Sequence, residues 1–268
     1  MRSAAINHQR VRLLLAALLS ALTGCGSAAH RTVEETFEQV YTIEPTANIT
    51  VTNGDGAIFI YGSNTNEMRV QAIKRAYTRE RLKQIAINVS IKPNAVSIAT
   101  KFPPQQKWAL SDRSGTVDYT IVVPASASIS ALDLKAGEVL LDAMRGREVR
   151  ARLSDGRIFA RNCFTNLDVT IDRGTLTLSY DWWEEEKFLA RATIAQGNAW
   201  MFLPGDSAFH LLAQAGHGKI ANDFNNLPLS ANAVAKGMKI DQIINGGGSA
   251  TIQIQVRNGN IKIAEANP

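Results

Sequence analysis

The sequence predicts an all-β protein built as a single-stranded β-solenoid, in which one chain winds into stacked coils joined by short Gly, Asn and Asp turns. Two observations favour this fold. Runs of alternating apolar and polar residues fill the chain from Ile49 onward, and such alternation is typical of half-buried strands. In the second half, a glycine followed by a short apolar-alternating strand recurs about every 20 residues, and such a period is typical of repeat architectures. A β-sandwich, which also has short strands at regular spacing, is the alternative.

The N-terminal segment has the regions of an export signal. Three arginines precede a short leucine-rich run that ends in Leu22-Thr23-Gly24-Cys25. This segment resembles a bacterial lipoprotein signal peptide. The resemblance implies that residues 1–24 are removed and that Cys25 carries the lipid, including a palmitate-type acyl chain. An ordinary secretory signal cut near Ser27-Ala28-Ala29 is the alternative. Because no Asp follows Cys25, the resemblance further implies the outer membrane of a Gram-negative bacterium.

The charge of the chain argues against a nucleic-acid partner. The 268 residues contain 29 Lys and Arg against 24 Asp and Glu, for a formal net charge of +5. Removal of residues 1–24 takes away Arg2, Arg10 and Arg12 and leaves a net charge near +2. A protein with so small an excess of positive charge lacks the general attraction to nucleic acid that a strongly basic domain has.

The next segment, 25–44, has little periodicity and is expected to be a tether, although a short first strand could begin near Glu34. The folded domain is expected to span 45–268, with a possible sub-boundary near 102–116, where adjacent prolines interrupt the pattern. One short helix is expected at 79–84, because Thr78 can cap it. Strands are expected at 85–91, 95–101 and 119–124.

The second half carries the repeat. Each repeat is a strand, a glycine turn and a second short strand, and the glycines are Gly137, Gly156, Gly174, Gly197, Gly218 and Gly259. We expect the glycines to occupy equivalent corners with positive φ, because a tight corner favours a residue without a Cβ. The apolar residues two positions later should then point inward: Val139, Ile158, Leu176 and Ile220.

The turns and strand ends resemble those of a family of exported bacterial proteins. The matching text is Val-Thr-Asn-Gly-Asp-Gly at 51–56, Tyr-Thr-Ile-Val-Val-Pro at 119–124, Asn-Gly-Gly-Gly at 245–248 and Val-Arg-Asn-Gly-Asn-Ile-Lys-Ile at 256–263. These features are similar to those of the DUF4097-like, or putative adhesin, proteins of the head-GIN group. The resemblance implies a β-helical or single-sheeted solenoid and brings no catalytic residues.

The sequence contains no motif that predicts catalysis or a cofactor. His210 and His217 are expected on neighbouring strands and lack a third metal ligand at a diagnostic spacing. Asp55, Asp155 and Asp172 stand at turns, where Asp commonly supports the local backbone. A polysaccharide hydrolase or lyase on a β-helix is the least favoured function, and it would require these carboxylates to gather with Arg157 and Arg173 in a cleft.

The candidate partner site is an insertion that lengthens one repeat. It contains Trp182, Trp183, Glu184, Glu185 and Glu186. Exposed aromatic rings beside carboxylates suit contact with a glycan or a protein, because a flat ring offers a large apolar area. The alternative is that the tryptophans pack and the glutamates are merely solvated.

Three other residues are expected to be buried. Trp108 and Trp200 should pack into the domain, and Cys163 should be a buried structural thiol.

The sequence therefore predicts a non-enzymatic, lipid-anchored envelope protein that acts as an adhesin or binding scaffold and reaches the membrane through its N-terminal lipid. A periplasmic accessory or signalling factor is the alternative function.

Overall fold

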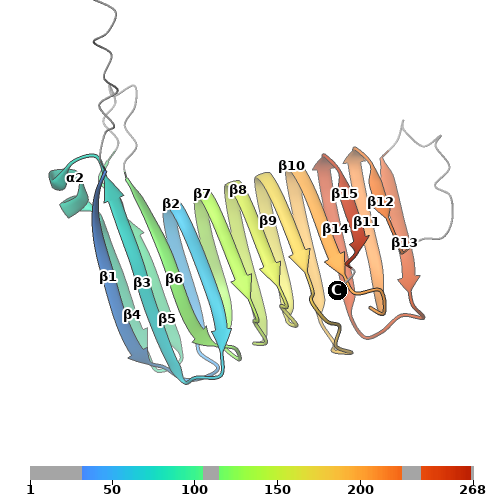
Figure 1. The fold of residues 1–268 in the computed structure, drawn as a ribbon, viewed down its shortest axis with the longest axis horizontal. Helices are drawn as coiled ribbons and strands as arrows, with labels where there is room; N and C mark the ends of the chain where they lie inside the picture. Colours follow the sequence, from blue (N-terminus) through green and yellow to red (C-terminus); the bar gives the residue numbers. More distant parts are fainter. Residues whose placement is uncertain (1–31, 105–114, 225–236, 267–268) are drawn as a thin grey trace, which may run out of the picture. The chain divides into compact units, whose positions relative to one another are not determined.

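The computed structural model describes residues 32–104, 115–224 and 237–266. Within the compact unit that begins at Val33, these residues form one mixed β-sheet of 15 strands that does not close on itself (Figure 1). The predicted all-β class is confirmed. Cys25 and Trp108 lie outside the described residues.

The longest strands of the sheet are β2 and β7 to β10, with 14 to 16 residues each. The elements are β1 (Val33–Thr42), β2 (Asn48–Ser63), β3 (Glu67–Ala76), α2 (Arg79–Gln84), β4 (Ala86–Lys92), β5 (Ala95–Lys101), β6 (Thr116–Pro124), β7 (Ser128–Asp142), β8 (Glu148–Arg161), β9 (Asn166–Ser179), β10 (Leu189–Leu203), β11 (Phe209–His217), β12 (Ile220–Asn222), β13 (Met238–Ile244), β14 (Thr251–Asn258) and β15 (Ile261–Glu265).

The strand order departs from the chain order at both ends. The main path is β1-β3-β6-β2-β7-β8-β9-β10-β14-β11-β13. Strands from β6 to β11 along this path run parallel, whereas β1, β3 and β13 join by antiparallel pairing. Strand β14, which follows β11 in the chain, lies between β10 and β11. The glycine repeat did not predict this insertion, because it indicates local turns and not which strands become neighbours.

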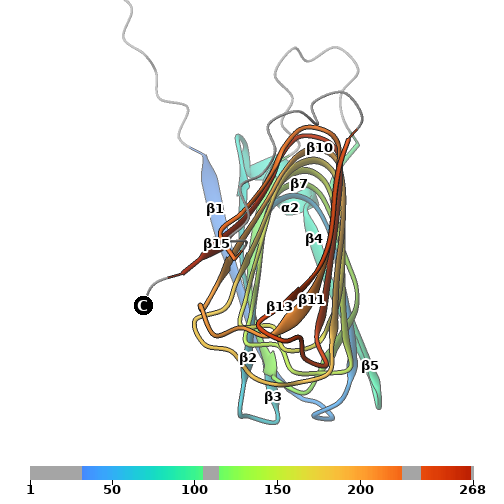
Figure 2. The same ribbon diagram turned by 90° about the vertical axis from the view of Figure 1, so that its right-hand side faces the viewer.

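The repeat glycines stack in register, as the sequence predicts. Gly56 pairs with Gly137, and Gly137, Gly156, Gly174 and Gly197 follow one another across β7, β8, β9 and β10. All have positive φ, between 121° and 145°. Gly259 continues this series beside Gly197, and Gly218 lies beside Gly259. We call these seven residues the glycine column. Figure 2 shows the long strands arching over in mid-length.

The glycine column is tight as well as strained. A Cβ on Gly174 would lie 1.8 Å from the carbonyl oxygen of Gly156, and a Cβ on Gly197 would lie 1.7 Å from that of Gly174. A real Cβ cannot approach a backbone oxygen this closely, because the two atoms would overlap. Glycine is therefore required here both by the backbone conformation and by the spacing of neighbouring strands.

The core lies directly beside the glycine column. The residues two positions after each glycine are aligned in register, and the four predicted to point inward are no more than 1% exposed: Val139, Ile158, Leu176 and Ile220. This prediction is confirmed. Burial of such a row is favourable because each apolar side chain removed from water contributes about 1.5–3 kcal/mol.

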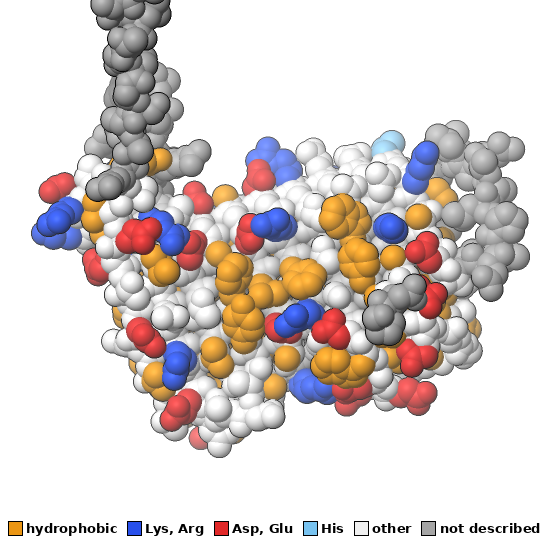
Figure 3. Space-filling model, in the orientation of Figure 1, with side chains coloured by type: hydrophobic (Ala, Val, Ile, Leu, Met, Phe, Trp, Pro, Cys, Tyr) orange, Lys and Arg blue, Asp and Glu red, His pale blue; other side chains and the backbone are white. Residues whose placement is uncertain are grey.

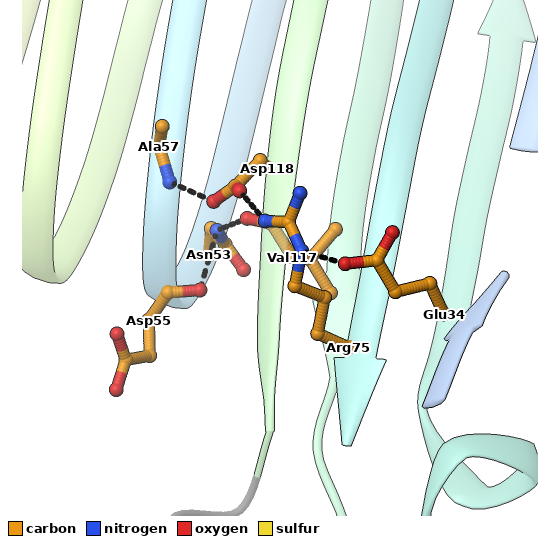
Figure 4. A network of polar contacts seen from close by, with 7 residues as sticks. All are labelled: Glu34, Asn53, Asp55, Ala57, Arg75, Val117 and Asp118. Atoms are coloured by element: carbon orange, nitrogen blue, oxygen red, sulfur yellow. Dashed lines mark hydrogen bonds and ion pairs between the residues drawn. The ribbon is translucent and has the colours of Figure 1, made fainter. Parts of the chain in front are cut away.

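A polar network joins the N-terminal strands to the parallel part of the sheet (Figure 4). Asn53 on β2 is 2% exposed, and its Nδ2 donates to the carbonyl oxygen of Val117 on β6 at 2.8 Å. The next residue on β6, Asp118, forms an ion pair with Arg75 on β3. Arg75 also contacts Glu34 on β1 at 2.7 Å. The network therefore ties four strands together at the end of the glycine column.

The prediction that residues 25–44 form a tether is partly wrong. Strand β1 occupies 33–42 and pairs along its whole length with β3, so these residues belong to the sheet. Val33, Phe37 and Tyr41 recur every four residues and pack partly buried against the core. Tyr41 also has a raised pKa because of partial burial. The short first strand that could begin near Glu34 is therefore present, and it is longer than the sequence indicated.

The short helix and the expected strands near it are confirmed. Thr78 caps α2, and its side chain accepts from the backbone nitrogen of Arg81 at 3.2 Å. Strands β4, β5 and β6 begin and end within three residues of their expected bounds. On either side of the proposed sub-boundary at 102–116, β5 and β6 both pair with β2, so the strands that flank it share one sheet.

Candidate functional site

The outer surface of the sheet carries a row of aromatic and apolar side chains. The residue three positions after each repeat glycine points away from the core on the strand segment that follows the glycine. In register across β2, β7, β8, β9 and β10 these residues are Phe59, Leu140, Phe159, Thr177 and Trp200. We call them the aromatic row.

The aromatic row is open to solvent. Trp200 is 44% exposed, and Phe59, Leu140 and Phe159 are partly exposed. Figure 3 shows hydrophobic side chains gathered over the middle of this face. With Phe202, the row lines a groove of about 650 Å³. The row is therefore a partly exposed apolar strip on the outer face of the sheet.

Charged groups flank the row and pair with each other. Glu138 forms an ion pair with Arg157 on one side. On the other side, Arg161 contacts Asp142 at 2.6 Å, and the hydrogen bond from its guanidinium to Asp142 raises the pKa of Arg161. Because each cation has an anion as its partner, these four groups add no net charge to the groove.

The strand segments before the glycines present a different surface. Their outward positions include Asp133, Arg150, Arg152 and Asp168, which line shallow polar hollows. The apolar groove is therefore confined to the segments that follow the glycines. The repeat itself does not require this difference between the outer surfaces before and after the glycines, because the strand segments on both sides of each glycine bury apolar residues at alternate positions.

The Trp182–Glu186 insertion is divided between packing and exposure. Trp183 packs against Tyr180, Phe188 and Phe209, with ring centroids 5.5 to 5.9 Å apart. Its Nε1 is buried and has no hydrogen-bond partner among the described residues. Trp182, in contrast, is 45% exposed. The two rings therefore play different roles, and only Trp182 presents a large surface to solvent.

Glu184 holds the insertion to the body of the domain. Both of its carboxylate oxygens accept from the Arg145 guanidinium, at 2.6 and 2.7 Å, and Trp182 Nε1 donates to it at 2.5 Å. The hydrogen bond from Arg145, followed by that from Trp182, lowers the pKa of Glu184 to about 2. Glu185 and Glu186 remain exposed.

The histidines do not form a site together. His210 and His217 lie on one strand, β11, and not on neighbouring strands as expected. His210 Nε2 lies 2.7 Å from Asp241 Oδ1 on β13. Within the residues that the structure describes, no group of three or more His, Cys, Asp or Glu side chains is placed to hold a metal ion.

Asp155, Arg157 and Arg173, which were considered for hydrolysis, each form an ion pair between neighbouring strands. Asp155 contacts Arg173 at 2.7 Å across β8 and β9, and Arg157 binds Glu138. Asp55 accepts a hydrogen bond from the Asn53 amide through its backbone oxygen. The Asp155, Arg157 and Arg173 side chains therefore support the contact between neighbouring strands.

Two further predictions concern individual side chains. Cys163 is 1% exposed, as predicted, and burial raises the pKa of its thiol to about 12. The expectation that Trp200 packs into the domain is wrong, because its position three residues after Gly197 places it on the outer face. The signal that could have found part of the groove is in the sequence: Phe159 and Trp200 both stand three residues after a repeat glycine, and Phe59 stands three residues after Gly56, which joins the series only through the register of the sheet.

Comparisons with known proteins place the chain near several solved structures. A putative cell adhesion protein from Clostridium sporogenes has 16% identity and a TM-score of 0.47, with 87% of this chain and 100% of that chain covered. A putative adhesin from Bacteroides fragilis has 10% identity and a TM-score of 0.31, with 86% and 97% covered. A putative lipid binding protein from Parabacteroides distasonis has 11% identity and a TM-score of 0.30, with 87% and 97% covered.

No protein-family model and no curated protein sequence matches the chain. Among the described residues, the structure contains no helix long and apolar enough to cross a membrane.

Proposed function

We propose that this chain is a lipid-anchored β-solenoid protein of the bacterial cell envelope that binds a partner on its outer face and catalyses no reaction. The in-register parallel strands and the glycine column support the solenoid. The groove supports binding: it is apolar at its centre, and the charged side chains beside it neutralise one another.

The observation that carries this function is the aromatic row. It spans five neighbouring strands, and it keeps Trp200 and Phe159 in contact with water although each would be stabilised by burial. Aromatic side chains dominate the energy of many protein interfaces, because they supply large rigid contact areas. We therefore expect the side chains of the aromatic row to supply most of the binding energy for a specific partner.

Retention on isolated cell envelopes tests the binding function. The full-length protein carrying Phe159→Ala and Trp200→Ala should bind envelope material on the order of tenfold more weakly than the unchanged protein. Ile243→Ala is the matched control, because Ile243 is 65% exposed but lies on β13, away from the groove. Equal retention of all three proteins, with unchanged thermal unfolding, would refute binding at this face.

The anchor is proposed at Cys25, which the lipobox sequence indicates. Two or more acyl chains would hold the protein durably at a membrane, whereas one chain alone binds only marginally. Cys25→Ser should remove the added lipid mass and release the protein from the membrane fraction. Normal fractionation and an unchanged mass in this variant would contradict lipidation. Protease treatment of intact cells would then separate a surface adhesin, which is cut, from a periplasmic factor, which is spared.

The exposed part of the insertion is proposed as a second, smaller contact. Trp182 and Glu185 point into solvent, while Trp183 and Glu184 fix the segment in place. A protein or glycan partner that reached this loop would meet one aromatic ring beside an acidic group.

A further inference from the structure

We infer that the occupant of the groove is a neutral, extended, β-linked glycan whose chain runs across the strands along the aromatic row. This inference rests on the proposed function, since it names the partner of the same groove. It is carried by the spacing of the aromatic residues, by the cancellation of charge beside them and by the hydrogen-bonding groups that line the groove.

The spacing comes from the register of the sheet. Phe59 and Phe159 stand on β2 and β8, with β7 between them, and Trp200 stands on β10, with β9 between it and Phe159. Neighbouring strands lie about 4.8 Å apart, so the aromatic rings recur every ~10 Å. An extended β-linked glycan repeats every two sugars over a similar distance. Each ring can therefore stack on the apolar C–H face of every second sugar.

The positions between the rings are smaller. Leu140 separates Phe59 from Phe159, and Thr177 separates Phe159 from Trp200. These side chains leave room for the sugars that present their other face, and the Thr177 hydroxyl can exchange hydrogen bonds with them. The whole row covers four strand steps, about 19 Å, which corresponds to about four sugars.

The charges beside the row favour a neutral ligand. Glu138 with Arg157 and Asp142 with Arg161 are paired across β7 and β8. An anionic or cationic ligand would find no net opposite charge along these strands. Glu138 and Arg157, which line the groove, still have free hydrogen-bonding capacity, because a carboxylate accepts at several positions and a guanidinium donates five N–H groups. Such groups suit the many hydroxyls of a sugar.

Calorimetric titration of the full-length protein with cello- and chito-oligosaccharides tests the inference. Affinity for at least one series should rise on the order of tenfold between two and four sugars and change little between four and six, because the row then ends. Maltohexaose, which is α-linked and curved, should bind at least tenfold more weakly. Binding should change less than twofold between about 50 mM and 500 mM salt, because screening acts on charges and the ligand has none.

Variants separate the stacking positions from their neighbours. Trp200→Ala and Phe159→Ala should each weaken binding of the four-sugar ligand about tenfold, whereas Ile243→Ala should leave it unchanged. Leu140→Ala should have a smaller effect, since it lies between stacking positions. Equal losses at Leu140 and Trp200 would overturn the two-sugar spacing.

The possible failures are distinguishable. If Trp200→Ala abolishes retention on envelopes but no oligosaccharide binds, the glycan is refuted and the binding function stands. Binding to vesicles of phosphatidylethanolamine and phosphatidylglycerol through the same groove, or self-association that Trp200→Ala disrupts, would identify a lipid surface or a second copy as the occupant and overturn the glycan. If the Trp200 variant affects none of these, both proposals fail.

Discussion

Replacing Gly174 with Ala should destabilise the protein severely, although it adds only one methyl group. The new Cβ would lie 1.8 Å from the carbonyl oxygen of Gly156, and the backbone there has a φ of 145°. The unfavourable conformation of a non-glycine residue costs about 1–3 kcal/mol. Pushing the neighbouring strand away adds about 1–3 kcal/mol, as overpacking generally does. We therefore expect a loss of about 4 kcal/mol, a large part of the stability of a typical domain.

Gly246 provides the control for this experiment. It also has a positive φ, of 80°, but a Cβ there would meet nothing within 4 Å. Gly246→Ala should therefore show the conformational cost alone, about 1 kcal/mol. Urea or thermal unfolding of the two variants measures the difference, which we expect to be about 3 kcal/mol, or a further fall in Tm on the order of 10 °C. Similar small losses in both variants would show that the close approach of strands in the glycine column does not control stability.

Three other predictions follow from individual side chains. Arg145 lowers the pKa of Glu184 from 4.5 to about 2, so the stability that the Glu184 carboxylate contributes is complete above pH 4.5 and disappears as the pH falls through 2. Glu184→Gln should therefore be less stable than the unchanged protein at neutral pH. A difference in unfolding free energy between the two proteins that did not narrow below pH 4.5 would contradict this. Cys163, whose pKa burial raises to about 12, should resist a thiol reagent at pH 8 until the protein is unfolded, and rapid labelling of the folded protein would show that the thiol is accessible. Trp182→Ala should leave the Tm nearly unchanged because the ring is 45% exposed. If the insertion contacts the partner, this variant should also be retained more weakly on envelopes.

The repeat could be predicted from the sequence because its causes are local. A glycine that must adopt a positive φ, followed two residues later by an apolar side chain, leaves a signature at each corner, as at Gly156 and Ile158. The pairing of strands at the two ends is not local. Nothing within 251–258 indicates that this segment lies between β10 and β11, because its alternating pattern would suit any position in the sheet.

The candidate groove was missed for a different reason. Trp182 and Trp183 are adjacent and stand out in the chain, whereas Phe59, Phe159 and Trp200 are separated by up to 141 residues. Only the register of the sheet brings these three residues into one line. A tally of side chains at a fixed offset from each repeat glycine would have connected them, since the offset sets which face a residue occupies.

The position of β14 between β10 and β11 has a consequence for the order in which the fold is assembled. Strands β7 to β10 pair with neighbours that are adjacent in sequence, so this part of the sheet can grow one strand at a time as the chain emerges. Strand β11 cannot take its final place in the same way, because its partner β14 is made about 40 residues later. During folding, β10 and β11 therefore keep unpaired backbone edges until 251–258 are in place, and exposed edges of this kind promote aggregation. Completion of the sheet is thus a late event that depends on a contact between distant parts of the chain. A chaperone that shielded β10 and β11 would act at the step where the chain is most prone to aggregation.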